Sequence, residues 1–357
     1  MPKTSINEER KVTVKDVARA SGVSATTVSR VLSGSNYPVS AAIRGTVLKV
    51  AGEMNYKPNL VYRSRKNTDN EIVTLIPTFS NPFFTSVITG FENMLKGENF
   101  HTLVYDVSSW LEGSTPNMLV YNILKKKIKG VLIASPVMYP AVEEFRNDFI
   151  SRNIKVVMAD CPKPNSIFNS VYYDYKKGSY LATEYLINQG HRRIVYAGLK
   201  LERESRELRV QGFLDAMRDH EIPCGEKQIL ILSGQNADEN TQIESGEKLA
   251  RQVLGLGERP TAVAVINDIV AFGMLRGFHR MNVKIPEEIS IIGFDDSVFC
   301  EMSYPALTTV KVQSEQMGKL AAMLLLNEIN GTSHSPLSLS LEPCIVERDS
   351  VSNVQAP

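Results

Sequence analysis

Several features that mark particular protein classes are missing from this sequence. Its 357 residues include one tryptophan, four cysteines and five histidines. The cysteines have no CxxC spacing and the histidines no metal-ligand spacing, so we expect no disulfide framework, no metal and no cofactor. No apolar run reaches the ~20 residues that span a bilayer. The polar N-terminus has no signal-peptide core, which predicts a cytoplasmic protein.

The sequence also lacks the signatures of common enzyme classes. It contains no GxSxG, HExxH or GxxxxGK[ST] motif. The lone GxG in LGLGERP, from Leu254, lacks a strand before it and a helix after it, and indicates a loop. We therefore do not expect an enzyme.

Positive charge is concentrated at the N-terminal end. Residues 1–66 hold 12 of the 40 basic residues and 4 of the 39 acidic ones, a net charge of +8 that leaves −7 for the remainder. A basic head on an acidic body is typical of a module that binds a polyanion such as DNA. Charge alone leaves open a solvated basic tail.

The residue pattern of the head is more specific. Residues 12–33, VTVKDVARASGVSATTVSRVLS, predict two short helices around a tight turn. Thr13 can cap the first helix, Gly22 can end it, and Ser24 can cap the second. This is the helix-turn-helix plan, whose second helix enters the DNA major groove. Apolar spacing predicts a third helix over about 40–55.

The stretch VKDVARASGVSATTVSRVLSGS, followed by NYKPN, resembles the lac repressor family of bacterial regulators. The rest of the chain continues the resemblance, with PTFSNPFF from Pro77, GHRRI from Gly190, LRVQGF from Leu208, INDIVAFG from Ile266, IGFDD from Ile292 and PALTTV from Pro305. The resemblance implies a sequence-specific DNA-binding regulator, most often a repressor. It also implies a homodimer on a pseudo-palindromic operator of double-stranded DNA.

The resemblance also assigns DNA contacts within the second helix. Ala25 and Thr26 fall where base edges are met, and Arg30, one turn later, suits guanine. A phosphate contact is the alternative for Arg30. Phosphate contacts, which fix register, are assigned to Ser24, Thr27 and Ser29.

The segment after the head departs from the family. The family usually forms a hinge helix here that enters the minor groove, with a wedging leucine at the position of Arg65. An arginine suits a narrow minor groove better than it separates bases. We therefore expect DNA contacts without the usual kink, made by Asn59, Arg63, Arg65 and Lys66.

The body alternates apolar runs with amphipathic stretches from Ile72 onward. Eight runs, beginning with IVTLI and ending with SIIGF, are typical of buried parallel strands. Their alternation with helices predicts two doubly wound parallel-sheet lobes. The resemblance extends here to periplasmic sugar-binding proteins, with three crossings between lobes near 161, 294 and 327.

These observations predict an all-α helix-turn-helix head followed by an α/β sensor. The expected domains are a DNA-binding domain (1–58), a hinge (59–70), an effector-binding and dimerisation domain (71–345) and a tail (346–357).

The resemblance places a ligand between the lobes. Arg209 matches the family's ligand-gripping arginine, Asp295 its cleft aspartate, and Asn267 a residue that often bonds a ligand hydroxyl. Such groups satisfy the donors and acceptors of a sugar. Further contacts are expected from Phe83, Phe84, Arg203 and Ser205. The alternatives are that Phe84 belongs to the lobe core and that Arg209 is a surface residue, and Asp268 is expected to cap a helix.

We therefore expect DNA binding to be controlled by a small molecule, a sugar or sugar derivative. Together, Arg203, Arg206 and Arg209 would tolerate an acid or phosphorylated sugar. The alternative is control by a phosphorylated carrier protein, which some family members use as corepressor. An exported sugar-binding protein is disfavoured by the basic head and the missing signal peptide.

Overall fold

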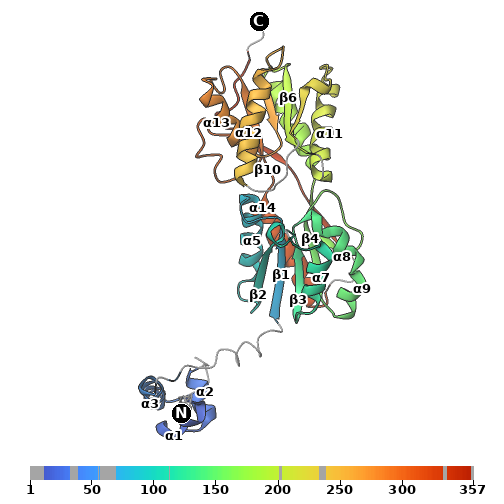
Figure 1. Cartoon of the computed structure of the whole chain (residues 1–357). Coiled ribbons are helices and arrows are strands. Elements are labelled where there is room, and N and C mark those ends of the chain that lie inside the picture. The colour runs from blue at the N-terminus through green and yellow to red at the C-terminus, as the bar shows by residue number, and fades with distance from the viewer. Residues whose placement is uncertain are drawn as a thin grey trace, which may run out of the picture. The chain divides into compact units, whose positions relative to one another are not determined.

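The computed structural model describes residues 12–32, 39–54, 56, 70–111, 113–200, 203–232, 239–332 and 336–354. The chain divides into two compact units, residues 1–68 and residues 69–357 (Figure 1). The first unit is all-α and the second is α/β, as expected. No helix within the described ranges is long and apolar enough to cross a membrane.

The head contains the helices α1 (Val14–Ser21), α2 (Ala25–Leu32) and α3 (Ala41–Glu53). Each helix contributes a fully buried valine to a shared core, namely Val17, Val28 and Val47. The predicted helix-turn-helix and third helix are therefore present.

The turn between α1 and α2 follows from its residues. The backbone N–H of Asp16 donates to the Thr13 hydroxyl while the Asp16 carboxylate accepts from the Thr13 N–H, which forms a capping box. Gly22 ends α1 at φ 67°, where a side chain would be strained. Ser24 Oγ accepts from the Thr27 N–H at 3.1 Å and so begins α2.

The sensor consists of two six-stranded sheets with equivalent strand orders, β11-β5-β4-β3-β1-β2 and β12-β10-β9-β8-β6-β7. Every pairing is parallel except that of β12 with β10. The N-terminal lobe holds β1 (Glu71–Ile76), β2 (His101–Asp106), β3 (Ile128–Ile133), β4 (Lys155–Cys161), β5 (Asn169–Tyr173) and β11 (Ser338–Leu341). The C-terminal lobe holds β6 (Ile194–Leu199), β7 (Ile229–Leu232), β8 (Ala262–Val265), β9 (Ser290–Asp295), β10 (Thr308–Lys311) and β12 (Cys344–Val346).

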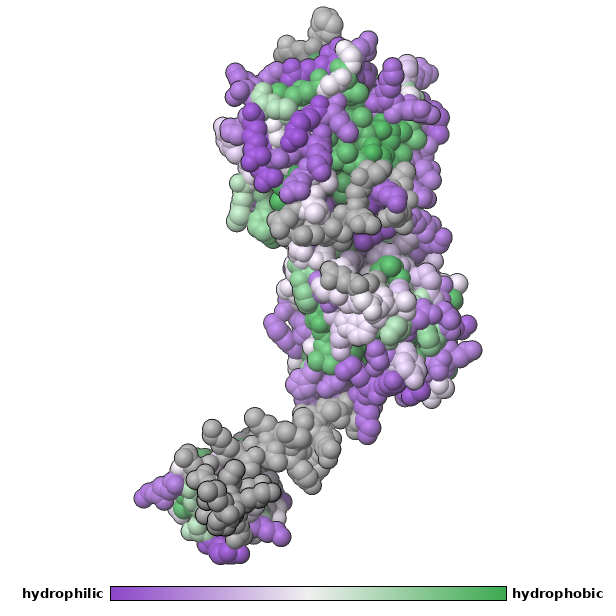
Figure 2. All heavy atoms as spheres, in the orientation of Figure 1, coloured by the Kyte–Doolittle hydropathy of each residue, from purple (hydrophilic) through white to green (hydrophobic). Residues whose placement is uncertain are grey.

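Helices cover both faces of each sheet (Figure 1). They are α5 (Pro82–Leu95), α6 (Val107–Leu111), α7 (Pro116–Leu124), α8 (Tyr139–Glu144), α9 (Arg146–Ser151), α10 (Tyr175–Asn188), α11 (Glu204–Asp219), α12 (Glu239–Leu254), α13 (Asp268–Arg280) and α14 (Ser314–Ile329), with 3-10 turns η2 (Pro136–Met138) and η3 (Glu226–Gln228). The apolar strands are buried between these layers, whereas the face of the molecule in Figure 2 is mostly hydrophilic.

The three crossings between the lobes lie later in the chain than predicted. The first joins β5 to α10 near 174, the second joins β10 to α14 near 312, and the third joins β11 to β12 near 342. The predicted positions 161, 294 and 327 are wrong because the chain adds a further short strand, β5, β10 or β11, before it leaves each sheet.

The predicted tail is also wrong for most of its length. Residues from β12 to Ser352 pack on the C-terminal lobe, and Ser350 is fully buried. Its Oγ donates to the Ile291 carbonyl at 2.6 Å and accepts from the Thr308 N–H at 2.8 Å. This segment therefore completes the lobe.

Candidate functional site

The DNA-facing residues predicted in the head lie on or beside α2. Val28 and Val31 face the core, whereas Thr26 and Ser29 are exposed and Ala25 and Arg30 are half-buried. The hydroxyls of Ser24 and Thr27 lie 2.9 Å apart at the start of the helix. The arrangement leaves a polar helix face available for a groove. The other candidates lie outside the described residues: Asn59, Arg63, Arg65 and Lys66.

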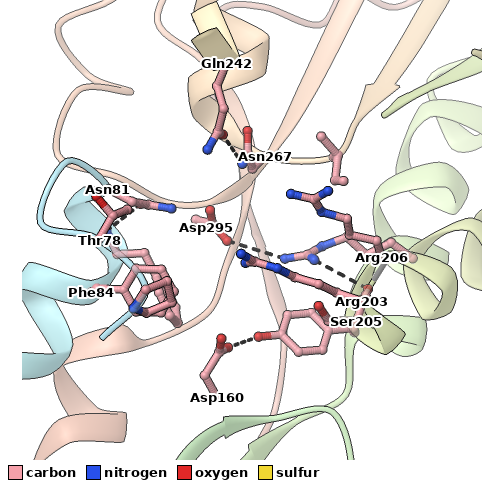
Figure 3. A pocket seen from close by; sticks show the side chains of 15 residues that line it. Thr78, Asn81, Phe84, Asp160, Arg203, Ser205, Arg206, Gln242, Asn267 and Asp295 are labelled. Atoms are coloured by element: carbon pink, nitrogen blue, oxygen red, sulfur yellow. Dashed lines mark hydrogen bonds and ion pairs between the residues drawn. The ribbon is translucent and has the colours of Figure 1, made fainter. Parts of the chain in front are cut away.

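The seven ligand candidates line one cavity between the lobes (Figure 3). The cavity encloses about 620 Å³, including space open to solvent. Its walls come from the carboxyl ends of β1, β4, β8 and β9 and from the first turns of α5, α11 and α13, where ligands of such folds bind. The candidates brought together are Phe83, Phe84, Arg203, Ser205, Arg209, Asn267 and Asp295.

Arg209 lines this cavity and is only 8% exposed. Its guanidinium lies 4.3 Å from the ring centroids of both Tyr175 and Phe294, which favours a cation. One terminal nitrogen is 3.7 Å from the Asp295 carboxylate, too long for a full hydrogen bond, and the buried Nε has no hydrogen-bond partner. Arg209 is therefore not a surface residue, and its donors are incompletely satisfied.

Asp295 ends β9 with a backbone φ of 119°, outside ordinary strand geometry. Burial raises the pKa of its carboxyl well above the ordinary value, and the nearby Arg209 guanidinium opposes that rise. Strained, buried ionisable groups in a cleft are typical of functional sites.

Asp160, which was not predicted, lines the cavity from the N-terminal lobe. It follows the apolar part of β4 at φ 64°, and its carboxylate accepts a hydrogen bond from the Tyr175 hydroxyl of the C-terminal lobe. Burial raises the pKa of Asp160 to about 6, while the Tyr175 hydrogen bond opposes the rise. This contact joins the two lobes at the cavity.

Helix caps fix the orientation of the amide groups in the cavity. Asn267 Oδ1 accepts from the Val270 N–H, so its Nδ2 donates to Gln242 Oε1 at 2.9 Å. The Gln242 NH2 group then has no partner within the described residues. Likewise, Asn81 Oδ1 accepts from the Phe83 N–H at 3.0 Å, which leaves its NH2 group for the cavity.

Phe83 and Phe84 fulfil both roles considered for them. Each is 6% exposed and belongs to the hydrophobic core, and each also lines the cavity. Their rings pack edge to face with centroids 5.0 Å apart. They form a fixed apolar wall opposite the arginines.

Asp268 does not cap α13 as predicted, because Asn267 does so. Asp268 is buried and accepts hydrogen bonds from the Ser297 N–H at 2.8 Å and the Thr309 hydroxyl at 2.6 Å. It thereby holds the loop after β9 against β10 and positions the Asp295 region.

Comparison with known proteins assigns both units. Residues 13–59 match the family of bacterial regulatory proteins of the lacI type, and residues 183–351 match a periplasmic binding protein-like domain. The repressor PurR of Vibrio vulnificus is 30% identical over 343 residues, which cover 96% of this chain and 99% of that protein. The chain belongs to the lacI family.

Solved structures of the lacI family agree with this fold. The lac repressor dimer bound to operator is 24% identical over 96% of this chain and all of that one, with a TM-score of 0.72. A lacI family regulator from Enterococcus faecium with bound ribose is 26% identical over 80% of this chain and all of that one, with a TM-score of 0.69.

The expected fold class is therefore confirmed. The chain is a DNA-binding transcriptional repressor with a ligand-binding sensor domain, and it is not an enzyme.

Proposed function

We propose that this repressor is controlled by a small polar ligand, a sugar or sugar derivative, bound in the cavity between the sensor lobes. The observation that carries this proposal is the convergence of all seven candidate residues, from both lobes, on one cavity. The cavity also lies at the carboxyl ends of parallel strands of both lobes, where ligands of such folds bind.

The chemistry of the walls supports a hydroxylated ligand. Asp160 and Asp295 offer acceptors, Arg203 and Arg209 offer donors, and each hydroxyl needs both. The ribose seated in the Enterococcus faecium relative is consistent with this class of ligand.

A ligand here would act by bridging the lobes. Contacts already join them at the cavity, since Tyr175 donates to Asp160 and Lys163 forms a 2.8 Å ion pair with Glu204. A molecule that contacts both walls stabilises the closed arrangement and shifts the population towards it. That shift would change how two copies present their heads to an operator.

For DNA binding, we propose a homodimer that places two α2 helices in successive major grooves. Thr26 and Arg30 would contact bases, with Ala25 offering a methyl contact. The hinge (59–70) would enter the minor groove through its basic residues. Phosphate contacts would come from Ser24, Thr27 and Ser29.

A thermal-shift screen of the full chain tests ligand control. The panel holds neutral sugars, sugar acids, sugar phosphates and purines, and each hit is followed by operator titration. A ligand at a hundred times its Kd adds about 2.7 kcal/mol to native stability. A hit that also changes operator affinity supports the proposal. If no compound binds and a phosphorylated carrier protein changes operator affinity instead, the carrier protein is the effector.

A further inference from the structure

The polar groups of the cavity offer more donors than acceptors. Those left without a partner by the described residues include the NH2 groups of Asn81 and Gln242 and the Nε of Arg209. Gln242 and Arg209 are both more than nine-tenths buried, and the Nε of Arg209 is itself a buried atom with no hydrogen-bond partner. A ligand that fills the cavity must supply several acceptors.

The acceptors on the walls are fewer and partly occupied. The Asp160 carboxylate already accepts from Tyr175, and Asp295 faces Arg209. Burial raises the pKa of both carboxyls, which disfavours their negative charge. A neutral polyol can use these two groups as acceptors for some of its hydroxyl protons, but it brings no negative charge to the arginines.

The net charge of the described lining is positive. Three arginines, Arg203, Arg206 and Arg209, face two carboxyl groups that resist ionisation. Arg206 donates to the Lys200 carbonyl at 2.8 Å. The Arg203 side chain has no hydrogen bond within the described residues and extends from the start of α11 into the space between the lobes (Figure 3).

The start of α11 supplies a third observation. Among the helices that begin at the cavity, α5, α10 and α13 are capped by the side chains of Asn81, Asp174 and Asn267, whereas α11 has no side-chain cap at Arg203. The first turn of α11 also carries Glu204 and Glu207, and Glu204 is paired with Lys163 of the other lobe. Its N–H groups without a side-chain cap retain the capacity to hydrogen-bond an anion.

We propose that the ligand carries an anionic group, a carboxylate or a phosphate, which binds between Arg203 and Arg209 at the N-terminus of α11. The remainder of the ligand then lies towards Phe83 and Phe84, with the NH2 groups of Asn81 and Gln242 donating to its oxygens. This inference rests on the proposed ligand control of the repressor and narrows the class of ligand.

The first test uses simple anions. The melting temperature of the full chain is measured in sodium phosphate and in sodium acetate, each against sodium chloride at equal ionic strength. We expect stabilisation by at least one of the two anions, and the stronger identifies the group. Arg203→Gln should weaken that anion's binding about tenfold, the loss expected for one charge-assisted hydrogen bond. Arg218→Gln is the control, because it removes a charge from the exposed end of α11.

The second test uses matched pairs that differ in one anionic group, namely glucose with glucose 6-phosphate, ribose with ribose 5-phosphate, and galactose with galacturonate. We expect the anionic member of at least one pair to bind tenfold or more tightly than its neutral partner, with this preference lost in Arg203→Gln.

Either of two results would overturn the inference. One is the absence of Arg203-dependent stabilisation by phosphate and by acetate. The other is equal or tighter binding of the neutral sugars. In the second case, a neutral sugar that still changes operator affinity would leave the proposal of ligand control intact. If no bound compound changed operator affinity, both the proposal of ligand control and the proposal of an anionic ligand would be wrong.

Discussion

Asp160 allows a stringent test of whether the cavity is a functional site. Functional sites often keep a buried charged group although that group lowers the stability of the fold. A pKa of about 6 in place of the ordinary 3.8 means that folding disfavours its ionisation. The resulting loss of folding stability is absent below pH 3.8, grows as the pH rises, and reaches its full value above the pKa of the folded protein. It corresponds to about 3 kcal/mol at pH 8 and to about half of that at pH 5.

Asp160→Asn removes the buried charge and keeps an acceptor for the Tyr175 hydroxyl. We expect the variant to gain stability relative to the wild type, and we expect that gain to be about twice as large at pH 8 as at pH 5. Urea unfolding can be followed by fluorescence of Trp110, the one tryptophan of the chain, which lies in α6 of the same lobe.

Asp148→Asn serves as the control, because Asp148 is an exposed carboxylate of the same lobe. It should change stability by no more than about 0.5 kcal/mol at either pH. A gain from Asp160→Asn that is the same at both pH values, or a loss that grows with pH, would refute the reasoning.

Three further predictions concern the head and the packing of the sensor. Arg30→Ala should cost about 1–3 kcal/mol of operator binding and relax preference at one base pair; in a binding-site selection, a uniform loss over all sequences would reassign Arg30 to phosphate. Thr13→Ala removes the capping box of α1 and should destabilise the head by about 1 kcal/mol, measured by thermal unfolding of the full chain; an unchanged transition would contradict the role of the cap. Gly212→Ala places a Cβ 2.1 Å from the Lys176 carbonyl where α11 crosses α10, so the free energy of unfolding of the sensor should fall by about 1–3 kcal/mol. Gly257→Ala is the control, because it has open space around it and should leave the stability unchanged. Equal effects of the two substitutions would show that α10 and α11 can move apart to accept the added methyl group.

The sequence predicted the long elements because their signals are local. Eight apolar runs correspond to β1–β4 and β6–β9, and the caps at Thr13, Gly22 and Ser24 were readable from single residues. The strands that escaped prediction, β5, β10, β11 and β12, have three to five residues each. Length alone does not explain the difference, because β7 and β8 also have four residues; those two are entirely apolar, whereas β5, β10 and β11 contain polar residues. The omission of β5, β10 and β11 displaced the three lobe crossings.

The candidate site was predictable where a residue follows a strand or begins a helix. Asn267 and Asp295 satisfy that rule, and Asp160 satisfies it as well, so the same signal could have found it. Tyr175 also begins a helix, α10, but it reaches the cavity only because the chain crosses between the lobes just before it, and that crossing was predicted too early. Gln242 could not be found in this way, because its role depends on an amide orientation set by Asn267.

The central claim is that a small ligand in the sensor cavity changes operator binding. The most direct measurement is an operator titration of the wild type and of Asp295→Ala, each with and without a ligand found by thermal shift. We predict equal operator affinities for the two proteins without ligand, and a ligand-induced change of tenfold or more in the wild type alone. A variant that responds like the wild type, or a ligand that binds without changing operator affinity, would contradict the account.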